Sequence, residues 1–505
     1  MPVAQAVLPR TGDSVGAPEV EGFTVARYNS VCRRINRRRK WDVIGILIIG
    51  AITASLFFRP SFLGWPQGIQ WITIAWLPGI PYILLLFFGY AVVAHDKMLI
   101  LGDPPPLSDR RRRVLFTLVT LGVEIDVVER TVRSVLYWTA RCARPDVETQ
   151  MWLVVEEPGY RQWATRYDSL AASGVNLFVV PKDYRTPKGT THKARALQFT
   201  QDMRHSLGLE DADTWVYHQD EETAVGEDTV RGIQELVLTA QEQTVGGAGL
   251  IAHPLDWDGR ASQIRDLTHT FHDFQVLYTV RHRYNLTSWF HGSHLIVRAD
   301  AEAAIGWDLG HPSFSEDSLM AFFLRQRYGW DTAFDILKGF AYESSPFSLR
   351  DQLKQRKRWF RSHFNCFLRR KDVTITRKVL TVYSTVTWLS ALPSFTGMVL
   401  SFTIGLHSTF PVFGAVTGVA WSTTVLMYIR GFDMNRDYLP TTDISRPRLV
   451  VNGLIGSLTD AVAPWYALFA GKTGVHDFIS KTSNGVVPGG LKLKRSRPER
   501  HEIGW

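Results

Sequence analysis

The sequence predicts an α/β domain built on a mainly parallel sheet and attached to apolar helices that cross a membrane. Long apolar runs without charge occupy both ends of the 505-residue chain. Charged residues gather in the middle, where short β-rich runs alternate with amphipathic stretches. The chain is 45% hydrophobic and 21% charged, which excludes wholesale disorder. The separation of apolar and charged segments argues against a simple soluble enzyme.

The N-terminal region predicts a flexible tail followed by a membrane hairpin. Residues 1–40 have no sustained period and end in a basic cluster, so we expect a flexible basic tail. Residues 41–95 hold the apolar runs Trp41–Phe58 and Gln70–Ala94, and the second has about the 20 residues that cross a bilayer. Because basic residues flank this pair and positive residues stay on the cytoplasmic side, both ends are expected in the cytoplasm.

The middle region, residues 96–345, predicts the sheet. Four short runs have strand character, and they are Val114–Leu121, Trp152–Val155, Val175–Val180 and Thr214–His218. Helical spacing follows the first and second runs, and the stretch His192–Met203 reads as a helix before the fourth. Strand, helix and strand at this rhythm indicate parallel strands covered on both faces, and ligands bind beyond their carboxyl ends.

Charged residues follow each predicted strand. In chain order they are Glu124 or Asp126, Glu156 or Glu157, Lys193 with Arg195, and Asp220 with Glu221 and Glu222. Acids after three strands and bases after one suit a nucleotide diphosphate with a divalent cation.

Asp220 and Glu222 are the strongest candidates for a Mg²⁺ or Mn²⁺ site, since such cations prefer hard oxygen ligands. The alternative is a set of acids at the start of a helix near Gly226. Lys193 can bind phosphate near a helix N-terminus, unless it only decorates a solvated helix face. Glu157 can accept a hydrogen bond from a base or ribose, with a plain turn acid as the alternative.

Two later polar clusters are candidates for the reacting hydroxyl. In Ser315–Glu316–Asp317 a carboxylate can act as general base, and the alternative is a helix cap with acids in the first turn. His291, Gly292 and Ser293 precede the predicted strand Leu295–Val297 and can line an acceptor pocket, unless they form only a polar turn.

The C-terminal part predicts an interface helix and further membrane segments. Residues 346–376 form an amphipathic stretch that carries Gln355, Arg358 and Trp359, which suit a diphosphate and a sugar face or, alternatively, only a basic juxtamembrane helix. Residues 377–472 are expected to form transmembrane or re-entrant helices. The apolar runs there are Val379–Leu406, Pro411–Ile429 and Leu449–Ala470.

The last apolar run, Leu449–Ala470, and the basic tail lead to conflicting predictions of membrane topology. Three full crossings would place the basic tail 473–505 outside, against the charge rule. Asp460 and Pro464 inside the last run therefore favour a re-entrant or interfacial segment that returns the tail to the cytoplasm. Three widely spaced cysteines predict neither a disulfide framework nor a zinc site.

The order of these pieces resembles the family 2 glycosyltransferases, which have the GT-A fold. The resemblance rests on a KxxAL-like His192–Leu197, a DxD-like Asp220–Glu222, a TED-like Ser315–Asp317 and a QxxRW match at Gln355–Trp359. Longer matches are similar to the egghead-type β-1,4-mannosyltransferases over about residues 90–475. They are VVPKDYRT…G…KARALQ, HQDEET, HGS and YESSPFSLRDQLKQRKRW.

The resemblance implies an inverting transfer from a GDP- or UDP-hexose to a lipid-linked or glycan acceptor at the membrane, with Mg²⁺ or Mn²⁺. Asp317 is the implied catalytic base. The implied nucleotide-sugar ligands are Glu157, Lys193, Asp220, Gln355, Arg358 and Trp359. The implied acceptor ligands are His291, Gly292, Ser293, Glu316 and Trp359. The implied metal ligands are Asp220 and Glu222. Glu222 is longer than the aspartate of the usual DxD motif, although the egghead motif shares it.

Two rival functions remain at this point. One is a processive β-glycan synthase, which needs more membrane crossings than the four or five expected here. The other is a membrane scaffold that binds nucleotide without catalysis. Nucleic-acid binding is not expected, because the basic residues follow the edges of the apolar runs. The expected location is an integral, multi-pass membrane protein with a cytoplasmic catalytic domain, in the cell membrane if the source is bacterial.

Overall fold

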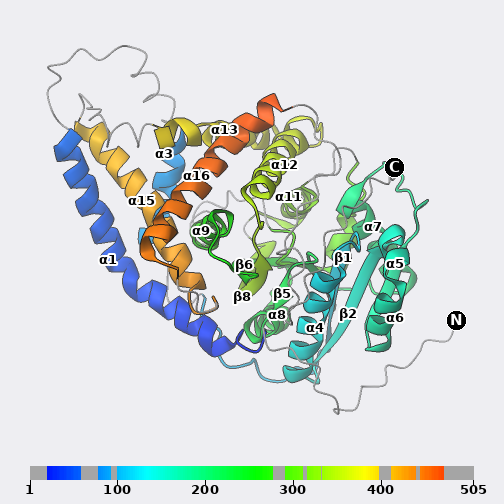
Figure 1. Cartoon of the computed structure of the whole chain (residues 1–505). Coiled ribbons are helices and arrows are strands. Elements are labelled where there is room, and N and C mark those ends of the chain that lie inside the picture. Colours follow the sequence, from blue (N-terminus) through cyan, green and yellow to red (C-terminus); the bar gives the residue numbers. More distant parts are fainter. Residues whose placement is uncertain are drawn as a thin grey trace.

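The computed structural model describes most of the chain outside its two ends. The described residues are 20–57, 78–92, 99–276, 291–310, 315–330, 332–396, 411–439 and 444–470. Figure 1 shows a sheet with its covering helices on one side of the molecule and a group of long helices on the other. The basic tail 473–505 and parts of the predicted runs Gln70–Ala94 and Val379–Leu406 lie outside the described residues.

The sheet of the described chain has eight strands in the order β3-β2-β1-β4-β7-β6-β8-β5. The strands are β1 Arg112–Thr120, β2 Val147–Glu156, β3 Asn176–Val180, β4 Thr214–Gln219, β5 Ala224–Val225, β6 Gly246–Leu255, β7 Leu295–Arg298 and β8 Phe334–Ser344. The first four are mutually parallel, which confirms the predicted strands and their direction. The second half is mixed, because β7 runs antiparallel to both β4 and β6.

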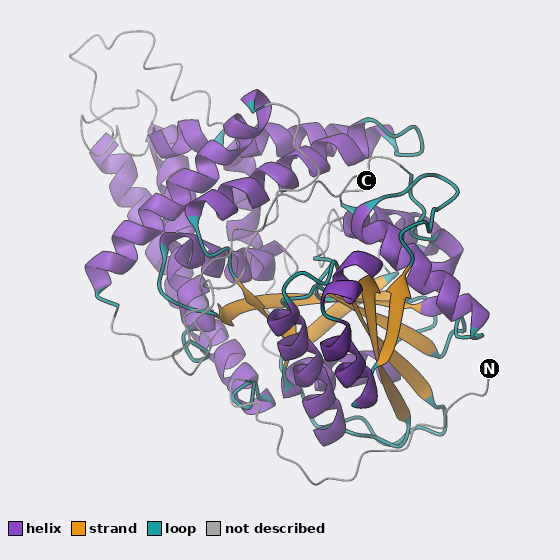
Figure 2. Ribbon diagram, turned by 45° about the vertical axis from the view of Figure 1, so that its right-hand side comes forward, coloured by secondary structure: helices purple, strands orange, loops and turns teal. Residues whose placement is uncertain are grey.

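Helices cover both faces of this sheet, as Figure 2 shows. Those that belong to this layer are α4 Ile125–Arg141, α5 Glu157–Gln162, α6 Ala164–Ala172, α7 His192–Ser206, α8 Glu227–Thr239, α9 Ala261–Val276, α10 Ala299–Ile305 and α11 Glu316–Tyr328. In α4 the buried positions recur at helical spacing, because one apolar stripe faces the sheet. Parallel strands with helices on both faces and an antiparallel insertion form an α/β sheet of the GT-A type.

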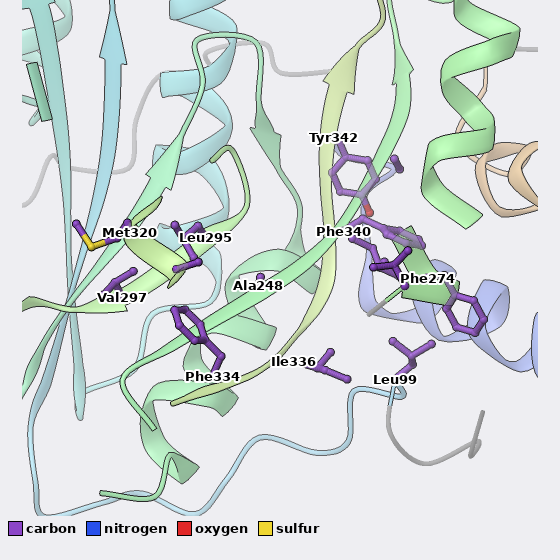
Figure 3. Packing of buried hydrophobic residues seen from close by; sticks show 14 of the residues in the cluster. Leu99, Ala248, Phe274, Leu295, Val297, Met320, Phe334, Ile336, Phe340 and Tyr342 are labelled. Carbon is purple, nitrogen blue, oxygen red and sulfur yellow. The ribbon is translucent and has the colours of Figure 1, made fainter. Parts of the chain in front are cut away.

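Two buried clusters hold the layers together. Between α4, α8 and the sheet the core includes Val132, Leu153 and Ile233, each at most 1% exposed. The larger cluster joins β6, β7 and β8 to the long helices, and Figure 3 shows it extending from Leu295 and Phe334 at one end to Leu99 and Phe274 at the other. The catalytic half and the helical half therefore share one core rather than meeting across a linker.

The long helices lie on the side of the molecule away from the sheet and its covering helices. They are α1 Val25–Phe57, α3 Gly79–Val92, α12 Leu349–Leu368, α13 Ile375–Leu389, α15 Pro411–Asn435 and α16 Arg446–Phe469. Figure 1 shows α1 and α15 side by side along most of their length. No helix in the described ranges combines the length and the apolar character that a bilayer crossing requires.

Two features of these helices differ from the sequence expectation. Helix α1 begins at Val25, so part of the expected flexible tail is helical. Its basic residues are held by α15, since Arg34 contacts Asp437 at 2.7 Å and Arg38 contacts Asp433 at 2.9 Å. The second feature is the run with the internal proline, where α16 continues through Pro464 as one helix.

Candidate active site

A cavity of about 2600 Å³ lies between the carboxyl ends of the parallel strands and the long helices. Eleven of the predicted site residues line it: Lys193, Asp220, Glu222, His291, Gly292, Ser293, Glu316, Asp317, Gln355, Arg358 and Trp359. Glu157 is not among the lining residues. The folded chain thus brings together residues that are up to 166 positions apart, counted from Lys193 to Trp359.

Lys193 and Asp220 lie in the wall of the cavity that follows the parallel strands. Lys193 begins the first turn of α7, Asp220 follows β4 directly, and their side chains form an ion pair. Lys193 Nζ also lies 3.4 Å from the carbonyl oxygen of Gly292. Burial alone would lower the pKa of Lys193, but Asp220, Glu316 and Asp317 together raise it, so the side chain is a fixed cation.

The three consecutive acids after β4 do not face the same way. The side chain of Glu221 accepts a hydrogen bond from Thr120 at the end of β1, and its main-chain oxygen accepts one from Thr131 at 2.7 Å. Burial, with Glu222 beside it, raises the pKa of Glu221 to about 8. Glu221 therefore joins β4 to β1 and α4 and Asp220 pairs with Lys193, while all three acids line the cavity.

The donor set fits a divalent cation that is shared with a substrate. Within the described part of the chain no three acidic, histidine or cysteine side chains converge as a metal cage. Mg²⁺ usually takes one or two carboxylates and fills its other positions with water and substrate phosphates. Asp220 and Glu222 meet that requirement, and a cation there would neutralise charge on a departing diphosphate.

Glu316 and Asp317 occupy the first turn of α11, opposite the Lys193–Asp220 pair. Ser315 precedes them at the N-cap position, but its side chain makes no capping hydrogen bond. Burial and the neighbouring Asp317 raise the pKa of Glu316 to about 7. Burial also raises the pKa of Asp317, which makes that carboxylate a stronger base than an exposed aspartate. Glu316 and Asp317 are therefore buried acids with raised pKa values, and not only first-turn acids of a helix.

Gly292 lies between the Lys193–Asp220 pair and Asp317 of α11. A Cβ atom built on Gly292 would lie 3.2 Å from Lys193 Nζ and 3.3 Å from both the Cβ and one carboxylate oxygen of Asp317. Asp317 and the Lys193–Asp220 pair therefore flank the same glycine. Such distances are tighter than ordinary van der Waals contact, so a side chain at this point in the HGS stretch would push against both groups.

A chain of polar contacts behind His291 was missed by the sequence reading. His291 Nε2 lies 2.7 Å from Asp273 Oδ2, and Asp273 also contacts His272, which meets Tyr82 at 2.6 Å. Burial would lower the pKa of His291, but the Asp273 carboxylate raises it to about 9. The ring is consequently an imidazolium at neutral pH, beside the acids of α11.

A second network, also missed, holds the QxxRW segment of α12. Arg356 is 5% exposed, pairs with Asp266, and reaches Asp460 of α16 at 2.7 Å. Its guanidinium lies 4.2 Å from the ring centre of Trp359. The acid inside the last apolar run is therefore the partner of a buried arginine, and Arg356 holds the indole that faces the cavity.

These missed residues had a detectable signal in α9. Asp266, His269, His272 and Asp273 recur at intervals of three and four, which places them on one face of a helix. At the end of β2, Glu156 is the acid that lines the cavity, paired with the buried Arg195. Glu157 instead accepts a hydrogen bond from the main-chain nitrogen of Lys182 at 2.8 Å.

Comparison with known proteins shows which families this chain is similar to. The family described as "Glycosyl transferase family group 2" matches residues 215–433. Beta-1,4-mannosyltransferase egh of Drosophila melanogaster is 31% identical over 43% of this chain and 46% of its own length. Beta-1,4-mannosyltransferase bre-3 of Caenorhabditis elegans is 26% identical over 42% of this chain and 46% of its own.

Among solved structures, mannosyl-3-phosphoglycerate synthase from Rubrobacter xylanophilus covers 50% of this chain and 72% of its own, with 14% identity and a TM-score of 0.29. A superposition at that score adds nothing to the fold described above. The chain spans less than half the length of the curated relatives that it matches. The segment that matches the family model, residues 215–433, begins in β4, just before the acids Asp220 to Glu222, and ends in α15. Residues 215–433 therefore carry the match to family 2 glycosyltransferases, and the chain is similar to the beta-1,4-mannosyltransferases over less than half of its length.

Proposed function

We propose that the chain is an inverting hexosyltransferase that moves a sugar, with mannose as the expected sugar, from a GDP- or UDP-linked donor to an acceptor hydroxyl. One observation carries the proposal: the Lys193–Asp220 pair and Asp317 of α11 flank Gly292 in one cavity. A donor bound at the pair presents its anomeric carbon to a hydroxyl bound at Asp317. Reaction from the opposite side of the leaving group produces a β-glycosidic bond.

Each group has a role that its surroundings support. Asp317 accepts the proton of the attacking hydroxyl, because burial makes its carboxylate more basic. The Lys193 cation and Arg358 bind oxygens of the leaving diphosphate, to which Asp220 is adjacent. A Mg²⁺ or Mn²⁺ ion at Asp220 and Glu222 would supply further positive charge there.

The acceptor side is assigned to Trp359, Glu316 and the HGS stretch. The Trp359 indole is a flat apolar surface that suits a sugar face, and Arg356 fixes its orientation. Glu316 and the His291 imidazolium offer an acceptor and a donor of hydrogen bonds to sugar hydroxyls. Glu157, which lies outside the cavity lining, is proposed only as a contact to the outer part of the nucleotide.

Attachment to a membrane is part of the proposal, and exposed apolar side chains support it. Trp41 of α1 is 70% exposed, Ile375 of α13 is 74% exposed, and Phe469 of α16 is 81% exposed. Large apolar side chains exposed on several helices suit contact with lipid or protein. The cavity reaches α13, α15 and α16, so an acceptor with a lipid anchor can enter from the same surface. We place the catalytic domain on the cytoplasmic side of a multi-pass membrane protein.

The test is transfer by the full chain in detergent, measured as metal-dependent release of nucleoside diphosphate across a panel of nucleotide sugars. Asp317→Asn keeps the shape of the base but not its charge, and we expect the rate to fall by about 10²–10⁴. The matched control Asp168→Asn changes an aspartate of α6 outside the cavity lining and should retain the activity. Wild-type activity in Asp317→Asn would remove the assigned base, and an inactive wild type with every donor would favour the scaffold. Product length separates single transfer from a processive synthase.

A further inference from the structure

Buried arginines in the described chain are usually matched by carboxylates. Arg195 pairs with Glu156, Arg204 with Glu302 at 2.9 Å, Arg356 with Asp266 and Asp460, and Arg430 with Asp42 and Asp433. Such matching is expected, because a charge removed from water is costly unless it is paired.

Arg377 of α13 breaks this pattern. The residue is 6% exposed, and within the described chain its Nε and Nη2 atoms have no hydrogen-bond partner. Its guanidinium lies 4.3 Å from the ring centre of Phe367 and lines the large cavity. The Arg377 guanidinium is therefore a buried cation that packs on the Phe367 ring at the wall of the cavity. Its Nε and Nη2 donors have no partner within the described residues.

The wall around Arg377 has one sign of charge. Of the cavity-lining residues that α12, α13 and the turn between them contribute, none is an aspartate or glutamate, whereas Arg358, Arg369 and Arg377 are cationic. Arg361 on the same wall is already engaged, since its Nε donates to the Ala467 carbonyl at 2.8 Å. The acids of the cavity come instead from the strand ends and from α9, α11 and α16.

We propose that Arg377 binds a phosphate group at the corner of α12 and α13, with Arg369 of the same cavity wall as a further cation. A guanidinium offers parallel donors that match two phosphate oxygens, and a dianion supplies the charge that this wall lacks. The site is distinct from the donor site at Lys193 and Asp220, and it stands whether or not the chain transfers a sugar. The phosphate belongs either to a lipid headgroup or to a soluble ligand.

The experiment compares thermal unfolding of the full chain in an uncharged detergent, with inorganic phosphate against chloride at equal ionic strength. We expect phosphate to raise the Tm of the wild type and to leave that of Arg377→Met unchanged. Without phosphate, Arg377→Met should unfold no earlier than the wild type, because it removes an unpaired buried charge. Arg377→Lys keeps the charge but loses the paired donors, and should weaken the apparent phosphate affinity about tenfold.

A matched control is Arg361→Met, which removes an arginine of the same wall whose donors are already used. It should lower the Tm through the lost carbonyl contacts while keeping the full response to phosphate. Asp317→Asn should also keep that response, so a failure of the catalytic assignment is separable from a failure of this site. An equal phosphate response in wild type and Arg377→Met would overturn the proposal, as would a large loss of Tm in Arg377→Met when the wild type shows no response.

Two further arms identify the source of the phosphate. Nanodiscs with phosphatidic acid, compared with phosphatidylcholine alone, stabilise the wild type but not Arg377→Met if the ligand is a lipid headgroup. Stabilisation by inorganic phosphate without any effect of phosphatidic acid assigns the site to a soluble ligand. Loss of metal-dependent nucleoside diphosphate binding in Arg377→Met would mean that Arg377 serves the donor, and would overturn a separate site.

Discussion

The Asp273–His291 pair offers a sharp test of how charge is arranged beside the base. Asp273 is buried in α9, and its carboxylate lies 2.7 Å from His291 Nε2. The pair stands next to Gly292, and the charge of His291 lowers the pKa of Asp317 against the effect of burial. Asp273→Asn keeps the volume of the side chain but removes the charge that holds His291 protonated.

The magnitude follows from the pKa of His291, which Asp273 raises from 6.5 to about 9 although burial opposes the rise. A shift of that size corresponds to about 3 kcal/mol in favour of the charged ring. Without the carboxylate, burial dominates and His291 becomes neutral at neutral pH. Asp317 then loses a nearby cation, and its pKa should rise further.

The assay is kcat/KM for nucleoside diphosphate release, measured between about pH 5.5 and 9.5. Because Asp317 must be ionised to act, activity rises with pH, and this acid limb should move to higher pH in Asp273→Asn. At neutral pH the rate should fall about tenfold and recover partly in base. A control is Glu210→Gln, which breaks the exposed His205–Glu210 pair at 2.8 Å and should leave the limb in place.

Stability gives an independent reading of the same pair. His291 has a folded pKa above its unfolded value, so its contribution to the free energy of unfolding is complete below about pH 6.5 and is lost as the pH rises through about 9. Asp273→Asn should remove that dependence. An acid limb that coincides with the wild type, together with an unchanged stability profile, would refute the reasoning.

Two other substitutions test the geometry and the core. Gly292→Ala places a methyl group 3.2 Å from Lys193 Nζ, so kcat/KM should fall between about tenfold and a hundredfold with little change in Tm, whereas Gly102→Ala, with open space around its Cβ, should behave as wild type; equal activity of both variants would contradict the assigned crowding. Asp228 is buried, and burial raises its pKa to about 7, so ionisation destabilises the fold as the pH rises from the unfolded value of 3.8, by at most about 4 kcal/mol. Asp228→Asn should therefore flatten the denaturant-measured stability profile between those pH values, and an unchanged slope would contradict the assignment.

The parallel half of the sheet could be predicted because its signals are local. Each of the strands β1 to β4 is an apolar run that ends in charged residues, and the parallel pairing follows from the helices between them. In the other half only β7 could be predicted, as Leu295–Val297, since β6 is a glycine-rich segment that pairs with β7 and β8 from distant parts of the chain. Register and direction there depend on tertiary contacts rather than on any short pattern.

The same distinction explains the candidate site. Residues that follow strands converge by topology, so Lys193, Asp220 and Glu222 could be grouped from the sequence alone. Asp273 and Arg356 lie within helices, where a charged residue usually faces solvent. Only the packing of α9 against α12 and α16 buries these two residues and gives each its own partner. Sequence order carries no information about that packing.

The cavity combines three surfaces whose chemistry matches three parts of one reaction. Acids after the strands face a fixed lysine, which suits a diphosphate that loses its sugar. Basic side chains on α12 and α13 form the second surface, and the apolar faces of α15 and α16 form the third. A soluble GT-A sheet supplies only the first surface. The proposed acceptor chemistry therefore requires the long helices to be part of the active site, because removing them would delete two walls of the cavity and the Arg356–Trp359 contact.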